Sequence, residues 1–238
     1  MMLPSKTFYT LFAGSYTEYS HNKAEYLSAV NRFIKNESVS PKSMIDVGAG
    51  DGKRGKYIAG VLSLEGFTIL DNSDGMIALA REIPGARIIQ ADISQPEFDI
   101  KQSYDLVLSL WNVLGHILPA NRKTTLMNLA SLVSPGGSII IDVNNRYNVS
   151  HYGVWSVVKN ILRDVFMSNK SNGDFKLKIK TDKGEIETIV HIFNPLEIEK
   201  LIKTAGLVVE KRKIINYDNG KDCKSFFGGQ LVYKLKKI

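Results

Sequence analysis

Residues 45–52, Ile-Asp-Val-Gly-Ala-Gly-Asp-Gly, decide how the rest of the chain is interpreted. An apolar strand expected over 43–47 runs into a turn with three glycines, and a helix is expected over 54–64. Glycine lets a ligand approach the bare backbone, and the free amides that open a helix donate hydrogen bonds to polar or anionic groups. The stretch therefore predicts a loop that binds a nucleotide cofactor.

Two kinds of cofactor fit this loop. Residues 50–55, Gly-Asp-Gly-Lys-Arg-Gly, match the G-x-G-x-x-G pattern of dinucleotide sites, and Asp71 follows at the distance that such sites require. This pattern alone would favour an NAD-dependent oxidoreductase. However, Gly48 is an extra glycine before the pattern, and Asp46 lies at the end of the strand. The longer pattern Asp-x-Gly-x-Gly-x-Gly resembles the first motif of the class I S-adenosylmethionine-dependent methyltransferases.

The resemblance extends to the next two predicted strands, because each also ends in an acid. In this family the acid at position 46 orients the loop and the methionyl amine of the cofactor. Asp71 matches the acid that binds both ribose hydroxyls, and Asp92 matches the acid at the adenine amino group. The resemblance thus implies S-adenosylmethionine as cofactor, bound by Asp46, Gly48, Ala49, Gly50, Gly52, Asp71, Asn72, Met76, Asp92, Ile93, Leu110 and Trp111.

Strands and helices alternate between residues 43 and 143, which predicts an α/β domain with a parallel sheet. Two final strands, at 207–216 and 226–236, follow a helix that starts at Pro195. The resemblance covers 43–238 and implies a Rossmann-like, seven-stranded, mostly parallel sheet of order 3-2-1-4-5-7-6. Its last strand is antiparallel, and helices lie on both faces. The other expected strands are 43–47, 67–71, 86–91, 104–110 and 137–143, and the expected helices are 54–64, 73–82 and 121–133, the last ended by Ser134-Pro135-Gly136-Gly137.

Two segments lie outside this alternation. Residues 1–42 contain a helical pattern over 23–34, and the resemblance implies that they form a lid over the cofactor. Residues 144–193 contain a helical pattern through 155–165 and two alternating strands, 175–181 and 185–193, around a turn at Asp182-Lys183-Gly184. The resemblance implies that this second segment is an inserted flap that covers the substrate.

Candidate acceptor-binding residues come from both segments and from the end of the fourth strand. They are Tyr16, Tyr19, Asn112, Arg146 and Tyr147. The alternative is that the tyrosines only pack the first segment on the sheet edge, and that Arg146 only caps the sheet.

His116 is the catalytic candidate because it follows the fourth strand, where open α/β sheets bind their ligands. An unperturbed histidine has a pKa of about 6.5, which suits a base for a hydroxyl acceptor, whereas an amine acceptor requires no strong base. The alternative is that His116 packs or caps the following turn. The other histidines have no His or Cys partners at zinc spacing, so we expect no metal.

Charge is distributed unevenly over the 238 residues. Residues 1–142 hold 13 Lys and Arg against 14 Asp and Glu, whereas residues 143–238 hold 18 against 10. A basic surface of this kind attracts polyanions, but a lysine-rich solvated face is the favoured explanation, because no recognised RNA-binding module accompanies the charge. We therefore expect a nucleic-acid partner to be unlikely without excluding it. The single Cys223 and the lack of a signal or membrane span indicate a cytoplasmic protein, either monomer or homodimer.

Taken together, these patterns predict a methyltransferase that moves a methyl group from S-adenosylmethionine to an oxygen or nitrogen of a small metabolite by in-line displacement. The absence of the Asn-Pro-Pro-Tyr and Pro-Cys signatures weighs against DNA methylation. Three alternatives stay open. They are an RNA or protein methyltransferase that uses the basic C-terminal face, an NAD-dependent oxidoreductase, and a non-catalytic protein that binds S-adenosylmethionine.

Overall fold

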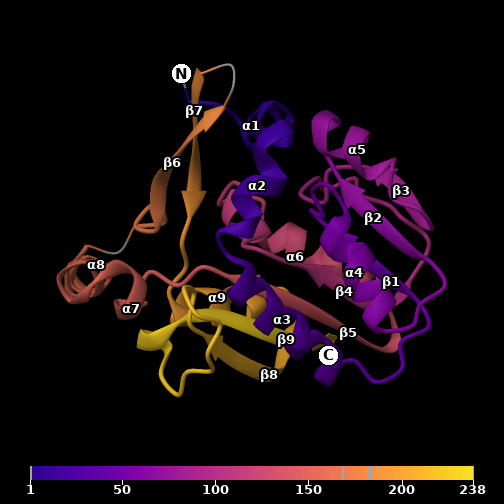
Figure 1. The fold of residues 1–238 in the computed structure, drawn as a ribbon. Coiled ribbons are helices and arrows are strands. Elements are labelled where there is room, and N and C mark those ends of the chain that lie inside the picture. Colours follow the sequence, from indigo (N-terminus) through magenta and orange to yellow (C-terminus); the bar gives the residue numbers. More distant parts are fainter. Residues whose placement is uncertain (1, 168, 182–183, 238) are drawn as a thin grey trace.

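The computed structural model describes residues 2–167, 169–181 and 184–237 (Figure 1). The turn residues Asp182 and Lys183, expected in the hairpin, lie outside them. A seven-stranded sheet of order β3-β2-β1-β4-β5-β9-β8 forms the centre. The first five of these strands are parallel, and β9 is antiparallel to both β5 and β8, which confirms the predicted topology. The strands are β1 (Met44–Val47), β2 (Phe67–Asp71), β3 (Ala86–Gln90), β4 (Tyr104–Ser109), β5 (Val133–Val143), β8 (Leu207–Ile215) and β9 (Gln230–Lys237).

Helices cover both faces of this sheet. The apolar cluster on one face includes residues of α6 (Arg122–Ser131) and α9 (Pro195–Thr204). The cluster on the other face includes residues of α3 (Ala24–Glu37), α4 (Lys53–Val61) and α5 (Asp74–Ala80). Strands β1 and β2 are buried along their whole length between these layers, as is typical of central parallel strands.

Several predicted boundaries were wrong, most of all the starts of β5 and β9. The helix expected over 121–133 ends at Ser131, and β5 already begins at Val133, so residues 134–137 lie inside the strand rather than before it. Pairing with β4 skips from Val133 to Ser138, because the left-handed Gly136, at φ 81°, lets the strand bulge and then continue. The last strand begins at Gln230, since Phe226–Gly228 forms the short 3₁₀ helix η3, capped by the hydroxyl of Ser225.

The N-terminal segment is mostly helical, with α1 (Ser5–Phe12), η1 (Ala13–Ser15) and α2 (Tyr16–His21) before α3. The predicted helix over 23–34 is confirmed within α3. Figure 1 shows α1 between α5 and the hairpin. Its backbone packs closely on α5, because a Cβ added to Gly75 would lie 2.6 Å from the carbonyl oxygen of Thr10.

The segment after β5 forms α7 (Val149–Tyr152), α8 (Val154–Phe166) and a separate two-stranded sheet of β6 (Asp174–Thr181) and β7 (Gly184–His191). The predicted hairpin and helix are thus confirmed. Phe8 and Phe12 of α1 pack against Ile179 of β6, and the amide of Leu3 donates to the carbonyl of Glu187 at 2.9 Å. The hairpin and α1 are therefore joined along one side of the sheet.

Candidate active site

The glycine loop lies at the carboxyl end of β1 and is fixed by β2. The amide of Gly48 donates to the carbonyl of Leu70 at 2.7 Å, and the amide of Gly50 donates to Oδ2 of Asp71 at 2.9 Å. Gly48 and Gly50 both have left-handed backbones, at φ 70° and 60°. The amide of Ser73 donates to Oδ1 of Asp71 at 2.9 Å, so this carboxylate holds two backbone segments in place.

A cavity of about 310 Å³ lies in front of this loop. It has the size of a small ligand site and lies at the edge of the sheet where such folds bind ligands. The structure brings eleven of the residues selected from the sequence to its walls, namely Tyr16, Gly48, Gly50, Asp71, Asn72, Met76, Asp92, Ile93, Leu110, Trp111 and His116.

A second cavity of about 200 Å³ continues behind Gly48, Leu110 and Trp111, and Asp46 and Ala49 line it. Asp46 is only 2% exposed, and its Oδ1 has no hydrogen-bond partner among the described residues. Arg54 lines the same cavity, and its Nη1 and Nη2 also have no partner among these residues. The two cavities therefore form one extended site, with unpaired groups of opposite charge at one end.

Burial raises the pKa of the Asp46 carboxyl to about 7, although the nearby Arg54 guanidinium opposes this shift. Asp71 also has a raised pKa because it is buried, and the amides of Ser73 and Gly50 oppose the rise. At Asp92 burial acts in the same direction, but hydrogen bonds from Ser94 outweigh it and leave the pKa lowered. Gly52 lines none of the three cavities of the site and instead begins α4 with a left-handed backbone, at φ 75°.

A third cavity, which we call the aromatic chamber, adjoins the first and has a volume of about 80 Å³. Its walls share Tyr9, Tyr16, Trp111 and His116 with the first cavity. Two further predicted residues, Tyr19 and Asn112, line it as well. The remaining walls are Phe12, Asn144, Leu177, Ile179, Val190 and Tyr217, so the N-terminal segment, the sheet and the hairpin all contribute.

The turn after β4 is held in an unusual conformation. Trp111 and Asn112 both have left-handed backbones at φ 61°, which costs non-glycine residues about 1–3 kcal/mol each. The amide of Trp111 donates to Oδ1 of the buried Asp142, and the amide of Asn112 donates to the Asp142 carbonyl at 3.1 Å. Neighbouring β5 therefore holds the Trp111 side chain at the junction of all three cavities.

His116 lies at the end of the 3₁₀ helix η2 (Val113–His116), with its Nε2 2.9 Å from the hydroxyl of Tyr9. Its Nδ1 is buried and has no partner among the described residues. Burial lowers the pKa of the imidazole to about 4, so this ring is neutral at physiological pH and a weaker base than an exposed histidine. The interaction with Tyr9 joins α1 of the N-terminal segment to the turn after β4.

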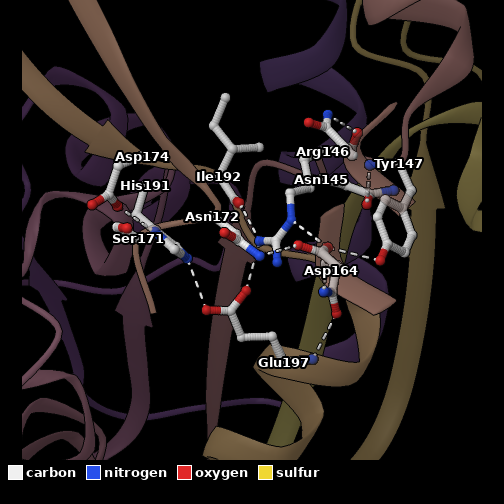
Figure 2. Close-up of polar contacts among 12 residues, drawn as sticks. Asn145, Arg146, Tyr147, Asp164, Ser171, Asn172, Asp174, His191, Ile192 and Glu197 are labelled. Atoms are coloured by element: carbon white, nitrogen blue, oxygen red, sulfur yellow. Dashed lines mark hydrogen bonds and ion pairs between the residues drawn. The ribbon is translucent and has the colours of Figure 1, made fainter. Parts of the chain in front are cut away.

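Arg146 and Tyr147 lie outside all three cavities, contrary to the expectation that they bind an acceptor. Figure 2 shows both side chains directed at Asp164 of α8. Nε of Arg146 is 2.8 Å from Asp164, Nη1 of Arg146 is 2.6 Å from Glu197 of α9, and the Tyr147 hydroxyl donates to Asp164 at 2.8 Å. The two residues join α8 and α9 to the end of β5.

The same network contains His191, which is 1% exposed and lies between two carboxylates (Figure 2). Its Nδ1 is 2.6 Å from Asp174, and its Nε2 is 2.8 Å from Glu197. Its carbonyl accepts a hydrogen bond from Nδ2 of Asn112 at 3.2 Å. The network therefore also positions β7 against the turn that carries Trp111.

Sequence reasoning missed Tyr9, Arg54 and Tyr217, all of which line the site. Arg54 follows the glycine loop by two residues, so its position in the sequence could have identified it as a site residue. Tyr9 and Tyr217 carried none, because only the packing of distant segments brings them to the end of β4.

Known proteins match the chain in both sequence and structure. Residues 44–137 match the family model described as a methyltransferase domain. The seven-stranded sheet has the strand order of the class I methyltransferase fold, as the resemblance implied.

One relative of this domain is the putative methyltransferase 235L of Invertebrate iridescent virus 6, 28% identical over 56% of the chain and 49% of that protein. The alignment thus spans about half of the viral protein. A second relative is the carboxy-S-adenosyl-L-methionine synthase of Aliivibrio salmonicida, 25% identical over 73% of the chain and 72% of that protein. Among solved structures, the DhpI-SAM-HEP complex superposes with a TM-score of 0.68 at 17% identity, covering 97% of this chain and 94% of that one.

Proposed function

We propose that the protein uses S-adenosylmethionine to methylate an oxygen or nitrogen of a small molecule. The observation that carries the proposal is a set of buried atoms at the inner end of the extended site, Oδ1 of Asp46 and Nη1 and Nη2 of Arg54, that have no hydrogen-bond partner among the described residues. An amino acid carries an ammonium group and a carboxylate on one carbon, so the methionine half of the cofactor satisfies both. Dinucleotides have no such half.

The other end of the extended site suits a nucleoside. Asp71 and Asp92 line it together with the apolar side chains of Met76 and Ile93. Carboxylates accept hydrogen bonds from ribose hydroxyls and from an exocyclic amine, and the apolar side chains pack on the faces of a base. These residues would hold the adenosine half, while the glycine loop leaves room for the backbone of the methionine half.

Bound S-adenosylmethionine supplies a methyl group on a positively charged sulfur, which is already a reactive electrophile. The chain therefore needs mainly to align an acceptor, and alignment of this kind contributes up to about 7–11 kcal/mol to a barrier. Trp111 separates the extended site from the aromatic chamber and lines both. We assign the chamber to the acceptor, with Tyr16, Tyr19 and Asn112 in its walls.

Two segments, the N-terminal helices and the hairpin, lie around the chamber, where they would cover a bound substrate. Tyr9 and Lys6 of α1 line the extended site, and the hairpin lines the chamber through Leu177, Ile179 and Val190. We assign residues 1–42 to a lid and residues 144–193 to a flap on the domain 43–238. Both would exclude water from the methyl group during transfer.

The experiment that tests the proposal uses methyl-labelled S-adenosylmethionine and a cell extract separated into metabolite, RNA and protein pools. Label in the metabolite pool is the expected result. Label in RNA or protein would overturn the small-molecule assignment, and protection of the protein against heat by NAD but not by S-adenosylmethionine would overturn the cofactor assignment. Binding of S-adenosylmethionine without label in any pool would favour a non-catalytic binding protein.

A further inference from the structure

The aromatic chamber contains no charged side chain among the described residues that line it. Six of its twelve lining residues carry phenyl, phenol or indole rings. A carboxylate or phosphate placed there would lose its water without gaining a counter-charge, which costs several kcal/mol. The chamber therefore disfavours an acceptor whose reacting end is anionic.

The rings of the chamber favour a positive charge instead. Tyr19 stacks on Trp111 with ring centroids 5.9 Å apart, and Tyr16 lies 5.7 Å from the same indole. A cation near the faces of such rings is attracted by their π electrons, most strongly when water is excluded. The volume of about 80 Å³ suits a small group rather than a whole metabolite.

Two polar groups of the chamber suit a nitrogen. Oδ1 of Asn144 is buried without a partner among the described residues, so it is a free acceptor for an N–H group. The backbone amide of Asn144 donates a hydrogen bond to Oδ1 of Asn112 at 3.0 Å, which holds Asn144 in place. His116, neutral because burial lowers its pKa, supplies a second polar wall but only a weak base. A hydroxyl acceptor requires a base to take its proton, whereas a neutral amine has a free electron pair.

We propose that the acceptor is an amine whose reacting nitrogen lies in the aromatic chamber, so that the methylated ammonium forms against Tyr19 and Trp111. The proposal rests on the proposed function and narrows it from oxygen or nitrogen to nitrogen. The nitrogen electron pair forms the bond to the methyl carbon while the carbon–sulfur bond breaks and sulfur keeps its electrons. The positive charge thus moves from sulfur to nitrogen, and a primary or secondary amine then loses one proton to water.

A pair of probes with one shape tests the proposal without turnover. Choline carries a trimethylammonium group, and 3,3-dimethylbutan-1-ol carries the uncharged tert-butyl group in its place. We expect calorimetry with saturating S-adenosylhomocysteine to show choline binding about ten-fold more tightly, the equivalent of one strong cation–π contact. Tyr19→Leu should reduce this preference, and Phe227→Leu, which alters an aromatic residue outside the three cavities, should leave it unchanged.

Equal affinity for the two probes, or tighter binding of the neutral one, would overturn the amine assignment. S-adenosylhomocysteine is titrated separately into each protein, so the two proposals fail independently. If the protein binds S-adenosylhomocysteine but shows no preference for choline, only the proposal of an amine acceptor is refuted. Failure of the unmodified protein to bind S-adenosylhomocysteine refutes the proposed function itself.

A second inference comes from α8, whose apolar face points away from the protein. Trp155 is 85% exposed and Phe166 77%, and the other members of this stripe are Val154, Val158, Leu162, Val165 and Met167, between 40% and 70% exposed. The opposite face is polar and is held to the body. Asp164 accepts hydrogen bonds from Arg146, Tyr147, Asn172 and Asn194 (Figure 2). The helix therefore cannot turn its stripe inward without breaking this network.

The stripe is large enough for a protein interface. An aromatic side chain carries about 150–250 Å², so Trp155 and Phe166 alone expose roughly 350 Å². With five aliphatic side chains the patch approaches the ~800 Å² that each partner contributes to a standard interface, and it exceeds the patches usual on monomers.

The order of residues in the stripe fits a second copy of the same helix. Two-fold symmetry brings residue i of one copy to residue j of the other and the reverse. In an antiparallel pair whose midpoint lies at the level of Asn160 and Ile161, Trp155 of one helix lies level with Phe166 of the other. A membrane surface fits less well, because helices that lie on membranes carry many basic residues beside the apolar face, whereas here only Lys159 lies exposed along the helix. We infer that the protein is a homodimer joined through α8.

Sedimentation of the full chain at several concentrations tests this second inference. We expect a dimer that becomes a monomer in the double variant Trp155→Ser, Phe166→Ser. Leu196→Ser, which removes an apolar side chain 77% exposed on α9, should leave the dimer intact. A monomeric parent protein would overturn the inference, as would binding to phosphatidylserine vesicles that the double variant abolishes.

Discussion

At the scale of single residues, Arg54 and Asp46 make separable contributions to cofactor binding. We expect Arg54→Met to weaken S-adenosylhomocysteine by one to two powers of ten, since a charge-assisted hydrogen bond contributes about 1.5–3 kcal/mol. The same change should leave 5′-methylthioadenosine unaffected, because that nucleoside has no carboxylate. Calorimetry with both ligands measures the difference, and Lys56→Met on the same helix is the control. Equal losses for the two ligands would remove Arg54 from the methionine end.

Asp46 makes cofactor affinity depend on pH. An ammonium group requires the ionised carboxylate, and burial places the pKa of Asp46 at about 7. The ionised fraction therefore falls as the pH falls below 7, and we expect S-adenosylhomocysteine affinity to fall with it, approaching ten-fold per pH unit. Calorimetry between pH 5 and 8 checks this, and His116, with its pKa near 4, contributes little over that range. A profile unchanged in Asp46→Asn would assign the dependence elsewhere.

Asp71 acts on the other end of the cofactor and on the loop itself. We expect Asp71→Ala to weaken S-adenosylmethionine by one to two powers of ten, because the variant loses the acceptor for ribose and the hydrogen bond that fixes Gly50. Asp99→Ala removes an exposed carboxylate as a control. Titration of both variants measures the effect, and unaltered affinity in Asp71→Ala would remove this residue from the site.

At the scale of elements, the ionic network decides how α8, α9 and the hairpin attach to the sheet. The Arg146 side chain is only 4% exposed, and its loss leaves the carboxylates of Asp164 and Glu197 without their main partner. We expect Arg146→Met to cost about 3–5 kcal/mol of unfolding free energy, or roughly a 10 °C fall in Tm. Thermal unfolding checks this against Arg87→Met, whose exposed side chain contacts Gln102. A change within experimental error would show that the network is dispensable.

The same network predicts the direction of acid sensitivity. Burial raises the pKa of both Asp164 and Glu197, but hydrogen bonds from Arg146 and from Tyr147 or His191 outweigh it and leave both pKa values lowered. A lowered carboxylate pKa stabilises the fold above the unfolded value, and this stability is lost as the pH falls below about 4. Arg146→Met should therefore flatten the stability profile on the acid side.

Elements whose residues are close in sequence were predictable, and contacts between distant elements were not. The glycine loop, the acids that end β2 and β3 and the order of the sheet all follow from local patterns of apolar residues, glycines and acids. The bulge at Gly136 was missed because Pro and Gly after a helix usually end one element before the next begins. Arg146 was misplaced for a related reason, since its partners lie 18 and 51 residues further along the chain.

The candidate site shows the same division. Spacing identified the cofactor end, because each acid there follows its own strand. Tyr9 and Tyr217 reach the aromatic chamber only through the packing of the first helix and the last hairpin on the sheet edge. The lowered pKa of His116 was equally hard to predict from the sequence. It results from burial of the imidazole, and Tyr9 of the N-terminal segment lies against this ring.

At the scale of the whole molecule, the excess positive charge lies in residues 143–238, which include the hairpin. Lys176 and Lys180 are exposed, and Lys178 pairs with Glu185 at 3.0 Å. We expect replacement of these three lysines by Gln to leave turnover of a small acceptor unchanged, because none of them lines the site. Steady-state kinetics at low salt measures this, and a strong loss would indicate a polyanionic substrate docked on the hairpin.

In the described part of the chain, no helix is long and apolar enough to cross a membrane.

The close packing of α1 on Gly75 also bears on the timing of the reaction. Tyr9 and Lys6 of this helix form part of the wall of the extended site, and Thr10 rests on the α5 backbone. A nucleoside bound in this site would be covered by α1 on that side. The spent cofactor should therefore leave at the rate at which this helix detaches, and the number of turnovers per second would be set by a rearrangement of the first dozen residues rather than by bond breaking.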